Sequence, residues 1–184
     1  ISVYGDTRIP VNELSKTQPI NLYAKNCLAA EKIVSKNLSK FKNKFIVLRI
    51  ANVFGIPNKN PSMIEKIILN NLFDKKFTFY KKNLIRSYIE INTLIKIIYK
   101  LITIKDSLFI YNISNPHYFF SFKDICSIFE NNLKISNKII FNTQKPLIIK
   151  SICNTNEIQK VFNFNEKFVF EIKKIINYYK KLKI

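Results

Sequence analysis

The side chains best suited to chemistry lie in one short segment near the start of the chain. Tyr23 precedes Cys27 by four residues, so a helix would place the phenol and the thiol one turn apart on one face. A phenol, with a pKa near 10, ionises about three units too high to act as a base at neutral pH, a gap of roughly 4 kcal/mol. Acid/base work at Tyr23 would need a neighbouring positive charge, and Lys25 lies on the opposite side of such a helix.

The cysteines predict neither a disulfide framework nor a metal site, because Cys27, Cys126 and Cys153 are too few and too scattered. We interpret them as reduced thiols of a cytoplasmic protein. Cys27 is interpreted as a small packing residue rather than a nucleophile. The single histidine, His117, lies far along the chain in a predicted exposed loop and cannot activate it.

The chain is strongly basic, with 31 Lys and Arg residues against 12 Asp and Glu residues in 184, a formal net charge of +19. Such an excess is one signature of nucleic-acid binding. The lysines are spread along the chain, however, and their short groups are not interleaved with Arg and Gly as in single-strand binders. We favour compositional drift over a nucleic-acid partner. No apolar run reaches the ~18 residues of a membrane span, so no membrane contact is expected.

Hydrophobic periodicity predicts helices alternating with strands, and therefore an α/β fold. Helices are expected at 22–38, 62–73, 93–104, 121–133, near 157 and at 166–182. Strands are expected at 45–48, 77–80, 88–91, 108–113 and 139–141, and a turn at 52–57. The continuous apolar run at 45–48 predicts a strand buried on both faces of a parallel sheet.

Local patterns add detail to three of these helices. Ser121 and Asp124 have the spacing of a capping box. Apolar residues recur at helical spacing in the first, second and last long helices: Leu22, Leu28, Ala29, Ile33 and Val34; Met63, Ile64, Ile67, Ile68 and Leu72; Phe168, Ile172, Ile175, Ile176 and Tyr179.

A series of linked segments gives a more specific signal. The segments are Ser2-Val3-Tyr4-Gly5, Glu13, Pro19-x-x-x-Tyr23 continuing to Glu31, Leu48-Arg49-Ile50-Ala51-Asn52-Val53-Phe54-Gly55, Arg86-Ser87-Tyr88-Ile89 and Tyr111-Asn112-Ile113. In order and spacing they resemble the extended short-chain dehydrogenase/reductase family, which includes the NAD-dependent sugar-nucleotide epimerases, dehydratases and reductases. The resemblance covers the whole chain.

This resemblance implies the C-terminal part of a Rossmann-like doubly wound parallel sheet, plus a smaller α/β substrate-binding lobe. Residues 1–57 would belong to the dinucleotide-binding domain. Residues 58–184 would form the nucleotide-sugar lobe, with about 86–114 returning to the Rossmann sheet. The family's Gly-rich phosphate loop and catalytic Ser/Thr would precede Ile1, in a missing N-terminal Rossmann half, which agrees with only two glycines here.

The resemblance also implies a site. Tyr23 would be the catalytic acid/base that exchanges a proton with a sugar hydroxyl, and Tyr23, Cys27 and Ile50 would contact NAD or NADP. Asn52 and Arg86 would bind the nucleotide-sugar, Arg86 through its diphosphate. From the residues alone, Asn52 could instead cap a turn and Arg86 could be a solvated charge.

Two positions depart from the family pattern. Cys27 stands where the family has the lysine that lowers the pKa of the tyrosine, and Thr93 stands where it usually has Asp. Arg49 is interpreted as a buried structural ion-pair partner, and Glu31 as structural.

The family resemblance narrows the reaction. Ile1 and Ser2 occupy the positions of the Asp-Glu pair of 4,6-dehydratases and cannot do its proton transfers. We therefore expect an NAD(P)-dependent nucleotide-sugar epimerase or 4-keto reductase, in surface-polysaccharide sugar synthesis, with a homodimer as one implied assembly. The alternative is a catalytically impaired member, with Cys27 in place of lysine, that acts as a binding or partner subunit.

Overall fold

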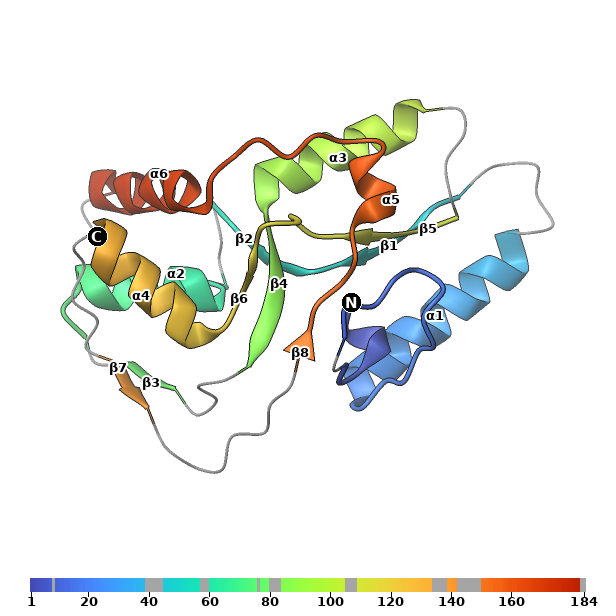
Figure 1. The fold of residues 1–184 in the computed structure, drawn as a ribbon, viewed down its shortest axis with the longest axis horizontal. Coiled ribbons are helices and arrows are strands. Elements are labelled where there is room, and N and C mark those ends of the chain that lie inside the picture. Colours follow the sequence, from blue (N-terminus) through green and yellow to red (C-terminus); the bar gives the residue numbers. More distant parts are fainter. Residues whose placement is uncertain are drawn as a thin grey trace.

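Parallel strand pairs form the centre of the protein (Figure 1). The computed structural model describes residues 1–7, 9–38, 45–56, 60–75, 77–79, 84–104, 109–133, 139–141 and 150–182. Strand β1 (Val47–Ile50) pairs in parallel with β5 (Ile110–Ile113), and β2 (Asn52–Phe54) pairs in parallel with β4 (Ile85–Glu90). Strand β4 also pairs with β6 (Phe119–Phe120), antiparallel, and with β8 (Lys150–Ser151), parallel. Strands β3 (Phe77–Phe79) and β7 (Ile139–Phe141) form a separate parallel pair.

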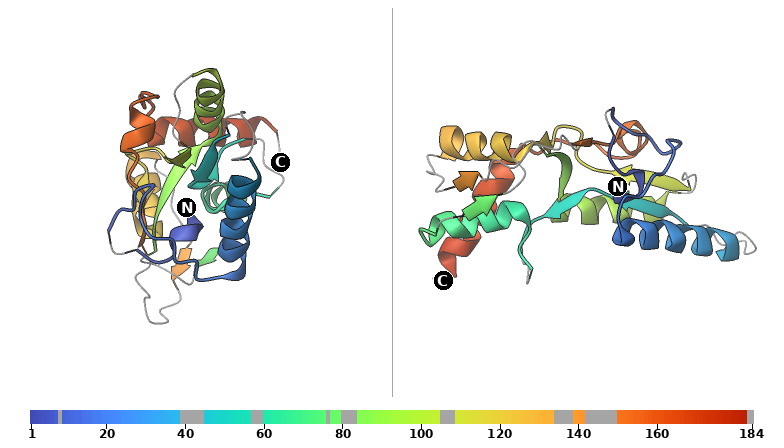
Figure 2. Two further views of the ribbon diagram at one scale, coloured as in Figure 1. Left: turned by 90° about the vertical axis from the view of Figure 1, so that its right-hand side faces the viewer. Right: turned by 90° about the horizontal axis from the view of Figure 1, so that it is seen from below.

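The helices lie at both ends of an elongated molecule and beside its central strands (Figure 1 and Figure 2). At one end α2 (Met63–Leu72), α4 (Phe122–Leu133) and α6 (Phe168–Lys181) share a hydrophobic cluster. Around β1 and β5, α3 (Ile91–Thr103) and α5 (Asn156–Gln159) cover a second cluster. The short helix η1 (Ser2–Tyr4) and α1 (Leu22–Leu38) form the remaining end. Among the described residues, no helix is both long and apolar enough to cross a membrane.

A buried carboxylate joins β2 to α2. Glu65 is fully buried, and its Oε1 accepts a hydrogen bond of 2.7 Å from the backbone N–H of Gly55 just after β2. Its Oε2 accepts one from the backbone N–H of Ser62, the N-cap of α2. Both contacts satisfy amides that burial would otherwise leave without a partner, so Glu65 sets where β2 ends and α2 begins.

Several sequence predictions are confirmed. Helix α1 and strand β7 have the expected bounds. The capping box is present, because Ser121 N donates to Asp124 Oδ2 at 2.7 Å and Asp124 N donates to Ser121 Oγ at 3.1 Å. In α6 the five residues of the expected apolar face are all buried. Residues 57, 80 and 108 of the expected turn and strands lie outside the described residues.

Other predictions are wrong at particular residues. Residues 52–54 are strand, not turn, because β4 supplies them with hydrogen-bond partners. The strand expected at 45–48 spans 47–50, and only Arg49 in it is buried. The strand expected at 88–91 ends at Glu90, and α3 begins at the next residue, Ile91. Glu90 caps this helix, because its Oε2 accepts a hydrogen bond of 2.9 Å from Thr93 N.

The apolar face of α1 is not a core face in this structure. Leu22 is 73% exposed and Ile33 is 62% exposed, whereas Ala24 is the fully buried residue of the helix. Cys27 and Leu28 pack partly against the cluster of η1. The helix therefore touches the rest of the described chain through a narrow strip.

Candidate functional site

A cleft of about 360 Å³ opens where η1, the start of α1, the end of β1 and the strand β4 meet. Four of the five predicted site residues line it: Tyr23, Ile50, Asn52 and Arg86. The cleft is also lined by Ile1, Ser2, Gly5, Ile20, Asn21, Ala51 and Leu84. Folding thus brings together candidates that lie far apart in the sequence. Parallel α/β sheets place ligands in such crevices beyond the carboxyl ends of strands.

Strand pairing fixes one side of the cleft. Asn52 is exposed, and its Nδ2 donates to the carbonyl of Ser87 on β4 at 3.0 Å, which ties β2 to β4. Arg86 is half-buried on β4. Within the described parts of the chain no carboxylate forms an ion pair with Arg86, so its guanidinium can meet an anionic group in the cleft.

The phenol of Tyr23 faces a thiol. Asn21 caps α1, since its Oδ1 accepts from Ala24 N at 2.8 Å, and Tyr23 stands in the first turn with 70% exposure. The hydrogen bond between Tyr23 and Cys27 raises the pKa of Tyr23, and the electrostatic effect of Cys27 and burial act in the same direction. A base needs the opposite shift. Lys25, also on α1, is exposed.

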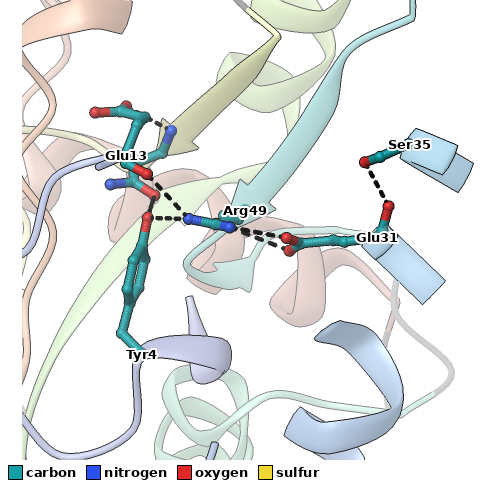
Figure 3. A network of polar contacts seen from close by, with 6 residues as sticks. Tyr4, Glu13, Glu31, Ser35 and Arg49 are labelled. Atoms are coloured by element: carbon teal, nitrogen blue, oxygen red, sulfur yellow. Dashed lines mark hydrogen bonds and ion pairs between the residues drawn. The ribbon is translucent and has the colours of Figure 1, made fainter. Parts of the chain in front are cut away.

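A network of polar contacts surrounds Arg49 (Figure 3). Arg49 Nη2 donates to Glu31 Oε2 at 2.8 Å, and Arg49 Nη1 donates to the hydroxyl of Tyr4 at 2.7 Å. The Tyr4 hydroxyl donates in turn to Asn112 Oδ1 at 2.7 Å. Burial raises the pKa of Tyr4, so the phenol keeps the proton that this bond requires. The structural interpretation of Arg49 and Glu31 is confirmed.

The remaining candidate groups lie outside the cleft. All three cysteines are free thiols, and burial raises the pKa of Cys126 to about 12 and also raises that of Cys153. His117 is exposed, and Thr93 is buried at the start of α3. In the described ranges no group of three His, Cys, Asp or Glu side chains could hold a metal ion.

Sequence reasoning did not assign Gly5, Asn21 and Leu84 to the site. Asn21 stands one residue before a predicted helix, which is a recognisable N-cap signal. Gly5 has φ +74°, and a Cβ there would lie 2.1 Å from the backbone oxygen of Gln18. A larger cavity, of about 450 Å³, lies between α2, α4 and α6 and contains none of the predicted site residues.

The family is decided by a match over most of the chain. Residues 1–114 match the model of the NAD dependent epimerase/dehydratase family. The chain belongs to this family. Among curated protein sequences, none matches the chain.

Solved structures agree with membership of the epimerase/dehydratase family at the level of fold. UDP-glucuronic acid 4-epimerase from Bacillus cereus, in complex with UDP-glucuronic acid and NAD, superposes with a TM-score of 0.86 at 20% identity, covering 98% of this chain and 59% of that one. UDP-glucose 4-epimerase from Thermotoga maritima, with UDP-glucose, gives a TM-score of 0.85 at 16% identity, covering 100% of this chain and 62% of that one. RMD from Pseudomonas aeruginosa, complexed with NADPH, gives 0.83 at 13% identity, covering 98% and 64%.

These comparisons confirm the predicted α/β, Rossmann-like architecture. The chain spans about three fifths of the length of the solved structures it matches.

Proposed function

We propose that this chain forms the nucleotide-sugar side of an NAD(P)-dependent epimerase or 4-keto reductase of surface-polysaccharide sugar synthesis in the cytoplasm. The observation that carries the proposal is the cleft itself. Its lining includes Tyr23, Ile50, Asn52 and Arg86. Arg86 would hold the diphosphate, Asn52 would orient the sugar, and Tyr23 would exchange the proton of a sugar hydroxyl.

The proposal includes a division of labour along the chain. Residues 1–57 would belong to a dinucleotide-binding domain, and 58–184 would form the sugar lobe, with about 86–114 returning to the sheet. The hydrophobic cluster that α2, α4 and α6 share supports a separate sugar lobe, and the parallel pairing of β1 with β5 supports the return of 86–114 to the sheet. A Gly-rich segment outside these 184 residues would hold the cofactor pyrophosphate, because the chain has only two glycines. A homodimer is a further part of the proposal.

The residues fit a nicotinamide cofactor only in part. When bound, such a cofactor supplies a hydride acceptor or donor. Tyr23 and Ile50 line the cleft where its ring would lie, whereas Cys27 brings no positive charge to hold a ribose or to favour the phenolate. The raised pKa of Tyr23 therefore favours a second candidate function, a catalytically impaired member that binds nucleotide-sugar as a partner subunit.

Calorimetric titration of the chain with UDP-glucose and with GDP-mannose tests the binding that both candidates require. We expect Arg86→Gln to weaken binding about tenfold, the effect of losing one charge-assisted contact. The control is Lys66→Gln, which removes an exposed charge on α2 away from the cleft and should leave affinity unchanged. The proposal would be contradicted if neither compound bound, or if Arg86→Gln and Lys66→Gln changed the affinity equally.

Turnover separates the two candidates. In a protein that also carries a dinucleotide-binding segment, the epimerase or reductase predicts conversion of a nucleotide-sugar, followed by NMR of the anomeric proton. The impaired member predicts binding without conversion, and conversion after Cys27→Lys.

A further inference from the structure

The network around Arg49 is joined to the walls of the cleft through neighbours in sequence. Arg49 directly precedes Ile50, which lines the cleft, and its partner Glu31 lies about two turns after Tyr23 on α1. We infer that Arg49 is a positioning residue that holds α1, and Tyr23 with it, at a set distance from the end of β1. The consequence for ligand binding rests on the proposed function, whereas the placement of α1 does not.

Hydrogen bonds around Arg49 close into a ring, which makes its position rigid. Arg49 Nη1 donates to the hydroxyl of Tyr4 and, at 3.3 Å, to the carbonyl of Glu13. Tyr4 donates to Asn112 Oδ1, and Asn112 N donates to Glu13 Oε1 at 2.8 Å. The ring therefore ties η1 and the following loop to β1 and β5. The guanidinium also lies 4.9 Å from the centre of the Tyr4 ring.

Glu31 links this ring to α1. Its carboxylate receives Arg49 Nη2 at 2.8 Å and Arg49 Nε at 3.2 Å, a two-pronged contact. Arg49 is 7% exposed and Glu31 is 16% exposed, so water and salt screen the pair little. Few other buried contacts with the described residues hold α1 in place.

Because α1 contacts the rest of the described chain through few buried residues, the Arg49–Glu31 ion pair is important for its placement. Ala24 is the fully buried residue of the helix, and Cys27 and Leu28 pack only partly against η1. The wide apolar face that normally fixes a helix in place is exposed, as Leu22 and Ile33 show. Because little apolar surface of α1 is buried against the described residues, the ion pair supplies much of the force that orients α1 on them.

Arginine is the side chain that this arrangement requires. The guanidinium of Arg49 donates to Glu31 through Nε and Nη2. Its third nitrogen, Nη1, donates to Tyr4 and to Glu13. A lysine ammonium would keep the charge but could not span acceptors on both sides. Arg49→Lys and Glu31→Gln should therefore loosen α1 without unfolding the chain.

Cys27 is a built-in reporter of the placement of α1, since its side chain packs partly against η1. Cys126 is buried in the distant cluster of α2, α4 and α6, so it reports on global unfolding. The experiment is a time course of alkylation by N-ethylmaleimide in native conditions, with each cysteine quantified by peptide mass spectrometry. The matched control is Glu157→Gln, which breaks an exposed ion pair with Lys160 of similar length, 2.9 Å.

We expect three variants to raise the rate of alkylation at Cys27 by about fivefold through local opening: Arg49→Lys, Glu31→Gln and the variant with both substitutions. The rate of alkylation at Cys126 should not change. Tyr4→Phe, the milder variant, should give a smaller increase, and Glu157→Gln none. An unchanged rate at Cys27, or parallel increases at Cys27 and Cys126, would overturn the inference.

Ligand binding separates this inference from the proposed function. If the cleft binds nucleotide-sugar, Glu31→Gln should weaken UDP-glucose binding and Glu157→Gln should not. A selective increase in alkylation at Cys27 in a chain that binds no UDP-glucose would support the positioning role and count against the proposed function.

Discussion

Substitution of Cys27 by lysine is expected to lower the pKa of Tyr23. Side chains four residues apart on a helix have Cβ atoms about 6 Å apart. Because Tyr23 is 70% exposed, a water-like dielectric applies, and a unit charge at that distance contributes about 0.7 kcal/mol. This corresponds to about half a pKa unit. Loss of the hydrogen bond to the thiol, which now raises the pKa, acts in the same direction.

The assay is an NMR titration of tyrosine ring carbons between neutral and alkaline pH. Tyr23→Phe identifies the Tyr23 signal among those of nine tyrosines. Cys27→Met removes the thiol without adding charge, so the difference between the lysine and methionine variants isolates the electrostatic effect. That difference should shrink in high salt. A Tyr23 pKa in the lysine variant equal to or above that of the methionine variant would refute the reasoning.

Three further predictions concern stability, each measured by urea unfolding. Gly5→Ala should destabilise the chain by about 2 kcal/mol, because the new Cβ meets the Gln18 carbonyl at 2.1 Å in a left-handed backbone; an effect below half that value would contradict the geometry. Glu65→Ala should cost about 3 kcal/mol, because the buried amide of Gly55 and the half-buried amide of Ser62 lose their acceptor, and Glu65→Gln should cost less. Stability should fall as the pH rises above about 9, because the folded state holds the Cys126 proton up to a pKa of about 12; by pH 10 the loss from this group is about 1.4 kcal/mol. Cys126→Ala should flatten the alkaline slope, and an unchanged slope would count against that assignment.

Helices with one strong apolar face were predictable from the sequence. In α2 the expected Ile64, Ile67 and Ile68 are buried, and in α6 the whole expected face is. Periodicity suffices there because each of these helices packs on one side into the hydrophobic cluster that they share with α4. The same reasoning failed for α1, because a pattern records which residues are apolar and not whether a partner covers them.

Strand β2 shows what local sequence cannot supply. Asn52 and the nearby Gly55 are typical of a turn, yet residues 52–54 pair with β4, which lies far along the chain. Likewise, no local pattern reveals that Glu65 is fully buried and serves Gly55. Both features depend on contacts between distant segments.

Linked motifs identify four residues of the cleft, whereas Cys27, chosen by the same reasoning, does not line it. Tyr23, Ile50, Asn52 and Arg86 were named from the order of their segments, and they line one space. Gly5 and Leu84 were missed as lining residues because backbone and packing surfaces carry no distinctive side chain.

The guanidinium of Arg49 holds a positive charge next in sequence to Ile50, which lines the cleft. Burial lowers the pKa of Arg49, but the hydrogen bonds with Glu31 and Tyr4 outweigh it and raise that pKa overall, while burial keeps Tyr4 protonated. Between about pH 6 and 9 a guanidinium group holds a constant charge. The positive charge of Arg49 is therefore not the source of any inflection in a plot of ligand affinity against pH in this range.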